Sequence, residues 1–94
     1  MDDGKFQWDD RKAASNIIKH GVSFDVATHI FDDVFAVDLI DTRENYDEER
    51  FTIIGMVKHR LLFVVYTMRG QAIRIISARG AEPNEEKDYY DANS

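Results

Sequence analysis

The fold is decided by residues 50–78, RFTIIGMVKHRLLFVVYTMRGQAIRIISA, in which apolar segments alternate with short polar turns. Three strands are predicted here, Arg50–Val57, Arg60–Thr67 and Gln71–Ala78. The connections at Lys58-His59 and around Arg69-Gly70 are so short that neighbouring strands must run antiparallel. Leu61–Tyr66 is apolar at both alternating sets of positions, which predicts a central strand covered on both faces.

The residues before this region predict a short strand and an amphipathic helix. Phe6–Trp8 alternates as a strand does, and Asp9 or Asp10 then offers a side-chain cap for a helix that runs to about His20 and stops at Gly21. Helical spacing places one group on the buried face, namely Ala13, Ala14, Ile17 and Ile18. It leaves another group nearer solvent, namely Arg11, Lys12, Ser15, Asn16 and Lys19.

Further elements lie on either side of the three strands. Ser23 is a candidate cap for a second short helix that ends near Asp32-Asp33. Val34–Ile40 is predicted as a half-buried strand with Phe35, Val37 and Leu39 on one side. An irregular acidic stretch, Asp41–Glu49, follows it. A last helix is predicted from Pro83 to about Asp91. This order predicts one α+β domain over residues 1–94, with helices and a short N-terminal strand against one face of a four-stranded antiparallel meander.

The charge of the chain is unevenly distributed. The net charge is −6, which disfavours phosphate binding, yet the 31 residues from Phe51 to Ala81 carry +5 and no acidic residue, leaving −11 for the other 63. The basic residues there are Lys58, Arg60, Arg69, Arg74 and Arg79. They form either a cationic face or an ordinary solvated strand surface. Direct DNA binding is not expected, because the chain is acidic and shows no recognition-helix pattern.

Several classes of protein and site are disfavoured by what the sequence contains. The chain has no cysteine, so disulfides and thiolate metal sites are excluded. The start Met1–Gly4 is acidic and lacks the order of a secretion signal, and the run Leu61–Tyr66 is too short to span a bilayer, so a cytoplasmic protein is expected. The histidines His20, His29 and His59 are scattered, which predicts no metal site and no cofactor.

A set of segments across residues 6 to about 90 resembles a known family. The segments are Trp8-Asp9 with Lys12 and Asn16, Lys19–Phe24, Phe31–Asp33, Arg50-Phe51, Gly55, Val65–Thr67, Arg69-Gly70 and Ile73–Arg79, followed by Ala81, Glu85 and Tyr89. Together they are similar to the BrnT family of small bacterial ribonuclease toxins. The resemblance implies a RelE-like fold, RNA cleavage that blocks translation, and inhibition by a BrnA-type antitoxin that carries a DNA-binding domain.

One feature departs from the family pattern. The last helix of the family is usually rich in Arg and Lys, whereas residues 82–88 of this chain read EPNEEKD. Two functions therefore remain open. The chain is either a metal-independent ribonuclease toxin, or a catalytically weak or inactive relative that only binds an antitoxin-like partner.

RNA cleavage without a metal needs a base for the ribose 2′-hydroxyl, cations for the phosphate and an acid for the leaving oxygen. His20 is a candidate base or acid, because imidazole titrates near neutrality and the last turn of a helix favours its protonated form. The alternative is that His20 only caps the helix or packs under Phe24.

The phosphate-binding candidates are Arg74, Arg79 and Lys12, since Arg binds phosphate in a two-pronged geometry. The alternative is that these residues are solvated at the surface or form ion pairs with the acidic helix and loop. Strict alternation places Arg74 and Arg79 on opposite faces of the strand, so a shared site needs a bulge or an early strand end. Glu85 and Tyr89, one helical turn apart, are either an acid and hydroxyl pair or a structural pair. Further RNA contacts are expected from Lys19, Arg69 and Arg60.

Overall fold

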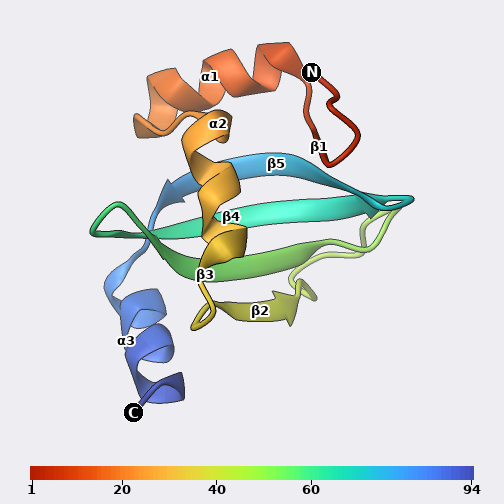
Figure 1. Cartoon of the computed structure of the whole chain (residues 1–94). Helices are drawn as coiled ribbons and strands as arrows, with labels where there is room; N and C mark the ends of the chain where they lie inside the picture. The colour runs from red at the N-terminus through yellow and green to blue at the C-terminus, as the bar shows by residue number, and fades with distance from the viewer.

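A five-stranded sheet with the order β1-β5-β4-β3-β2 forms the centre of the computed structural model, which describes residues 1–94 (Figure 1). Its strands are β1 (Phe6–Gln7), β2 (Val37–Ile40), β3 (Phe51–Val57), β4 (Arg60–Arg69) and β5 (Ala72–Gly80). The predicted antiparallel meander β2 to β5 is confirmed. The N-terminal strand β1 adds to it as a fifth strand, parallel to β5, which makes the sheet mixed.

The helices begin and end where their capping residues predict. They are α1 (Asp10–His20), α2 (Phe24–Ala27) continued by the 3-10 helix η1 (Thr28–Asp32), and α3 (Pro83–Ala92). The Asp9 side chain accepts hydrogen bonds from the Arg11 and Lys12 amides at the start of α1, and Gly21 ends that helix with φ 68°. The Ser23 hydroxyl accepts the Val26 amide at the start of α2. No helix is long and apolar enough to cross a membrane.

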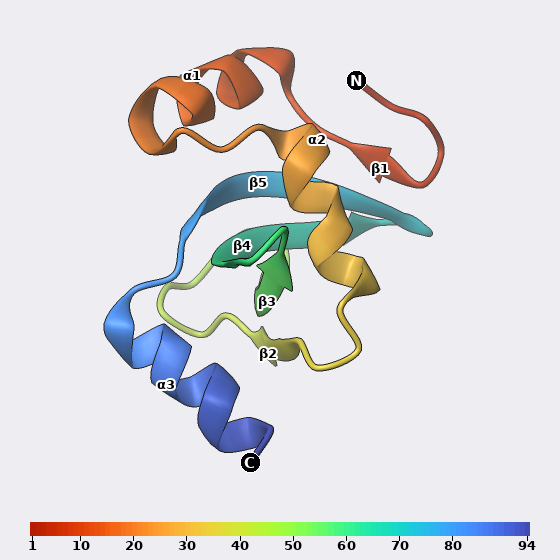
Figure 2. The ribbon, with the colours of Figure 1, turned by 60° about the vertical axis from the view of Figure 1, so that its left-hand side comes forward.

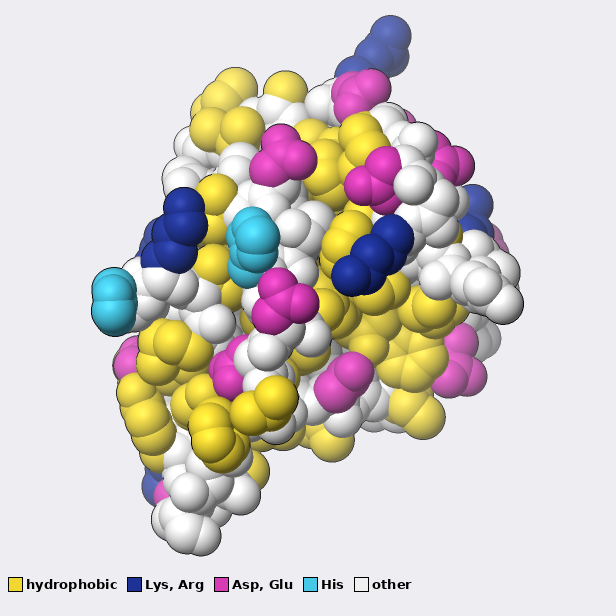
Figure 3. All heavy atoms as spheres, viewed as in Figure 1, with side chains coloured by type: hydrophobic (Ala, Val, Ile, Leu, Met, Phe, Trp, Pro, Cys, Tyr) yellow, Lys and Arg dark blue, Asp and Glu magenta, His cyan; other side chains and the backbone are white.

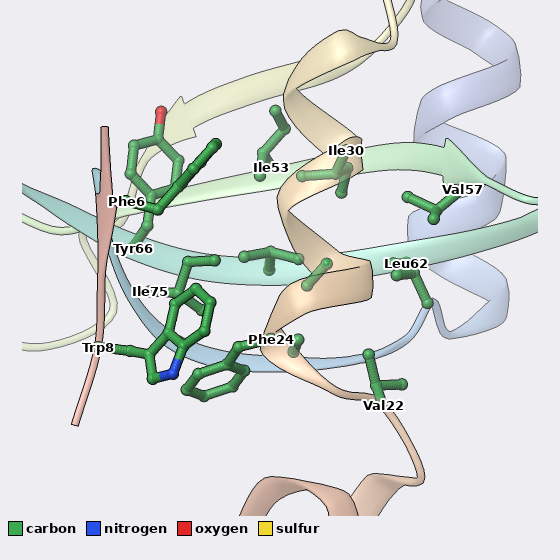
Figure 4. Close-up of a cluster of buried hydrophobic side chains, with 13 residues drawn as sticks. Phe6, Trp8, Val22, Phe24, Ile30, Ile53, Val57, Leu62, Tyr66 and Ile75 are labelled. Atoms are coloured by element: carbon green, nitrogen blue, oxygen red, sulfur yellow. The ribbon is translucent and has the colours of Figure 1, made fainter. Parts of the chain in front are cut away.

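The sheet buries side chains on both faces, as the apolar strand β4 predicts. On one face α2 and η1 lie across the strands and cover a cluster that includes Phe24, Ile30, Leu62 and Ile75 (Figure 4). On the other face Tyr89 of α3 packs with Ile54, Leu61, Phe63 and Val65. Figure 2 shows α2 and α3 on opposite sides of the sheet. The expectation that all helices share one face is therefore wrong for α3.

The predicted strand Val34–Ile40 is shorter than expected because Asp33 makes a turn. The carboxylate of Asp33 accepts the Phe35 amide and its carbonyl accepts the Ala36 amide, so pairing with β3 starts only at Val37. The predicted burial is also wrong on this strand. Phe35 is 60% exposed and Leu39 is 58% exposed, because no element covers this edge of the sheet.

The predicted burial of α1 is confirmed only for Ala13, which packs against the core. Ile17 and Ile18 are 50% and 86% exposed, while Asn16 is only 5% exposed. The Asn16 amide nitrogen donates to the carbonyls of Val22 and Ala78, and its oxygen accepts the Ala78 amide. Asn16 therefore acts as a strand neighbour for the edge of β5, and these backbone bonds turn the polar stripe of α1 toward the sheet.

We expect Asn16→Ala to destabilise the protein by about 3 kcal/mol, because it leaves the buried amide and carbonyl of Ala78 and the carbonyl of Val22 without partners. Urea unfolding followed by circular dichroism measures the loss. Asn45→Ala is the matched control, because Asn45 is exposed in the loop before β3. Equal stability of the Asn16 and Asn45 variants would contradict the assigned role.

Candidate functional site

A bulge in β5 brings its two candidate arginines to one face of the sheet. Val65 pairs with Ser77 but Tyr66 pairs with Ile75, so Ile76 is an extra residue between the two pairs. An extra residue shifts the alternation of side chains by one position. Arg74 and Arg79 consequently lie on the same face, the one that also carries α3. From sequence, a site that uses both arginines was expected only with such a bulge or an early strand end.

A pocket of about 260 Å³ lies between α1 and the bulged part of β5. Its lining residues are Lys12, Ser15, Asn16, Lys19, His20, Ile76 and Ser77. The side chains of Lys12, Lys19 and His20 are exposed at its rim. The pocket therefore brings together, on one helix, His20, the phosphate-binding candidate Lys12 and the predicted RNA contact Lys19.

Arg74 extends this cationic surface along β5. Its guanidinium donates to the side-chain oxygen of Gln7, 3.1 Å away, which leaves its other donors available. The pKa of Asp9 is lowered first by the hydrogen bond from the Lys12 amide, and further by the positive charges of Lys12 and Arg74. Arg74 and Lys12 thus act on the same point at the start of α1, and their positive fields overlap.

Arg79 is already occupied by carboxylates from α3. Its two terminal nitrogens lie 2.7 and 2.8 Å from the carboxylate oxygens of Glu85, and one of them is 3.1 Å from Glu82. The guanidinium also lies over the ring of Phe63, 4.3 Å from the centroid. Hydrogen bonds to Glu85 raise the pKa of Arg79. This two-pronged ion pair fastens α3 to β5 and uses the donors that a phosphate would need.

Glu85 and Tyr89 do not form the acid and hydroxyl pair considered from sequence. Burial disfavours ionisation of Glu85, but bonds from Arg79 and the Glu82 amide outweigh it and lower the pKa of this carboxyl. The Tyr89 hydroxyl donates instead to Asp33, at 2.8 Å. The pKa of Tyr89 is raised to about 12, mainly by burial and further by this hydrogen bond. Both side chains hold α3 in place.

Arg69 and Arg60 lie away from the pocket. The guanidinium of Arg69 makes a two-pronged pair with Glu48, at 3.0 and 3.1 Å, beside the β4–β5 turn. The guanidinium of Arg60 lies against the backbone of Gly80, where a Cβ atom would meet it at 2.6 Å. No group of three or more His, Asp or Glu side chains has the arrangement of a metal site.

Four residues that line the pocket were not predicted as site residues, namely Ser15, Asn16, Ile76 and Ser77. Ser15 and Asn16 were expected near solvent, yet Asn16 is buried. A usable signal exists only for Asn16. Asparagine is a poor helix former, so its place in the middle of an 11-residue helix indicates a specific contact. The position of Ser77 depends on the bulge at Ile76, and no turn residue at that point of the sequence predicts the bulge.

The Arg79–Glu85 pair predicts a loss of stability in acid. Because the pKa of Glu85 is lowered in the folded protein, the pair stabilises the protein above the unfolded glutamate pKa of about 4.3. That stability is lost as the pH falls through the lower folded value. We expect Glu85→Gln to cost about 2 kcal/mol at pH 7 and less below pH ~4, measured by urea unfolding. Glu86→Gln, on an exposed neighbour, is the control; an unchanged pH profile for Glu85→Gln would contradict the role of the pair.

Comparison with known proteins gives one family. A search of curated proteins found no match to the chain. The family model described as the ribonuclease toxin, BrnT, of type II toxin-antitoxin systems matches residues 8–85. The match runs from Trp8, just after β1, to Glu85 in the first turn of α3, and so includes the pocket between α1 and β5. The chain therefore belongs to the BrnT family of type II ribonuclease toxins.

Proposed function

We propose that this chain is a metal-independent endoribonuclease whose cleavage site is the pocket between α1 and β5. The observation that carries the proposal is that Lys12, Lys19 and His20 line this one pocket in a member of a ribonuclease toxin family. The side chains of Lys12, Lys19 and His20 are exposed at the rim of the pocket. Such a site suits a single strand of RNA, whose backbone phosphates remain accessible outside the bases.

His20 is the proton-transfer residue of the proposed reaction. As a base it takes the proton of the ribose 2′-hydroxyl, whose oxygen then attacks the adjacent phosphorus. The bond from phosphorus to the 5′ oxygen breaks, and that oxygen takes a proton from water. The products are a 2′,3′-cyclic phosphate and a free 5′-hydroxyl. No metal is required, because the chain supplies the base and the neighbouring cations.

Lys12 and Lys19 stabilise the charge that develops on the phosphate, and Arg74 extends RNA contact along β5. Lys12 and Lys19 are seven positions apart, so they lie on the same side of α1, about two turns from each other. The proposal leaves Arg79, Glu85 and Tyr89 outside the reacting centre. Their polar atoms are paired within the protein, where they hold α3.

An antitoxin partner follows from membership of a type II toxin-antitoxin family. We propose further that the toxin acts in the cytoplasm by blocking translation, and that its partner is a BrnA-type antitoxin with a DNA-binding domain. Any operator binding then comes from the antitoxin. Induction of the chain with and without that partner, followed by growth and by incorporation of labelled amino acids, tests this part.

We expect His20→Ala to lower the rate of RNA cleavage by at least about 100-fold, because general acid–base catalysis contributes ~10²–10⁴. The measurement is cleavage of a labelled single-stranded RNA by purified protein, in buffer with and without EDTA. His29→Ala is the control, since His29 lies on η1 with its side chain 62% exposed.

Three outcomes would contradict this assignment. Equal activity of the His20→Ala protein would exclude His20, and loss of cleavage in EDTA would exclude metal independence. If the wild-type protein neither cleaves RNA nor arrests growth, the ribonuclease function fails and the chain is a module that only binds its partner.

We also expect Lys12→Ala to weaken RNA binding and to reduce its salt dependence. Each phosphate contact on a single strand contributes about 0.7 to the slope of log K against log salt. The wild-type slope should therefore fall by about 0.7 in this variant, measured by fluorescence anisotropy with a labelled RNA of ten or so nucleotides. Lys87→Ala changes a lysine on α3 that pairs with Asp91, and it should leave the slope unchanged.

A further inference from the structure

The outer edge of β2 has backbone groups without partners. The Asp41 amide donates to the carbonyl of Arg50 on β3, so the amides of Leu39 and Val37 also face β3. By the same alternation the amides and carbonyls of Asp38 and Ile40 point away from the sheet. No hydrogen bond is formed by these outward groups with the rest of the chain. They form a short, open ladder at the end of the sheet.

Apolar side chains flank this open edge on both faces. Leu39 and Ile40 are 58% and 59% exposed although they point to opposite faces of the sheet. Val34, Phe35 and Tyr90 are also exposed nearby. Figure 3 shows hydrophobic side chains gathered over the segment that joins η1 to β2, beside acidic ones. Monomeric proteins usually protect an edge strand with charge, a bulge or a cover, and β2 has only the charge of Asp38.

The surroundings of this edge are strongly acidic. Between Asp38 and Glu49 there are six acidic side chains and one basic one, Arg43, whose charge is matched by Asp41 at 2.7 Å. α3, which contacts β2, adds further acidic residues. A second copy of the chain at this edge would bring two such acidic groups together, which is unfavourable. A segment with basic side chains would be attracted.

We propose that β2 is the docking edge for the antitoxin, which adds one extended strand with alternating apolar and basic side chains to the sheet. This proposal rests on the proposed toxin function, since it names the surface that the inhibitor uses. The outward groups of Asp38 and Ile40 pair with the added backbone, and Leu39 and Ile40 pack against its apolar side chains. Its basic side chains lie against the acidic loop between Asp41 and Arg50.

The test uses the antitoxin encoded beside the gene for this chain, purified in complex with the full-length toxin. Amide hydrogen exchange of free and bound toxin, resolved by residue, should show fast exchange at Asp38 and Ile40 in the free protein and strong protection in the complex. The β4–β5 turn at Gly70 is the internal reference and should not change. A complex in which these two amides exchange as fast as in the free toxin overturns the proposal.

Variants give an independent measurement of affinity. Leu39→Lys adds a repulsive charge at the apolar edge. Ile40→Pro removes an outward amide together with the exposed Ile40 side chain, and edge strands tolerate proline. Each should weaken the complex at least about tenfold in Kd, and thermal unfolding checks that both remain folded. Ile18→Lys makes the same type of change at an 86% exposed residue on α1 and should have no effect.

The outcomes separate this proposal from the proposed function. If the antitoxin binds the Leu39→Lys and Ile40→Pro proteins at full strength, or only Ile18→Lys weakens the complex, docking at β2 is wrong while the toxin function stands. If sedimentation shows dimers of the free chain that Leu39→Lys abolishes, the occupant is a second copy and the proposal is again overturned. Failure of the ribonuclease function alone would appear as absence of RNA cleavage and growth arrest with antitoxin binding intact, and the variants would still test docking at β2.

Discussion

Where a short strand ends before its neighbour does, the neighbour's buried backbone groups need other partners, and this constraint organises the molecule. At one edge the Asn16 side chain bonds the amide and carbonyl of Ala78 where β1 has ended. Near the other edge, β2 pairs with β3 only from Val37 opposite Ile54 onward. The next amide of β3 on the β2 side, that of Met56, donates instead to the Asp33 carboxylate, at 2.8 Å. Each polar side chain continues a strand that is too short to cover its neighbour. Each therefore fixes where a helix lies against the sheet.

The bond between Asn16 and β5 has a consequence for the pocket. It holds α1 beside the strand, so Lys12, Lys19 and His20 lie around one pocket near Ser77, with their side chains exposed at its rim. Ile17 and Ile18 are exposed as a result, at a cost in unburied apolar surface. The buried hydrogen bonds of Asn16 offset this cost, and the same orientation gives the pocket its cationic rim.

The sequence predicts the elements of the fold better than their contacts. Asp9, Gly21 and Ser23 act locally, so the bounds of α1 and α2 follow from short patterns. The buried side of α1 was wrong because it depends on a partner distant in sequence: Asn16 meets Ala78 across 62 positions. For the candidate site, the sequence named Lys12, Lys19 and His20 separately, and the structure places them around one pocket. Pairing of the arginines with the acidic helix and loop was only the alternative interpretation from sequence, and the structure shows it for Arg79 and Arg69.

Two of the arginines in the strand region are paired with carboxylates, which limits the positive surface of this acidic chain to a few side chains. Arg79 is neutralised by Glu85 and Arg69 by Glu48, so two of the five basic residues in the strand region offer little to an RNA phosphate. The cations without carboxylate partners at the pocket lie along α1 and β5, whereas the acidic loop borders β2 at the opposite end of the sheet. In the two proposals above, RNA binds at the pocket between α1 and β5 and a basic antitoxin strand docks at β2, so the two partners use different edges of the sheet.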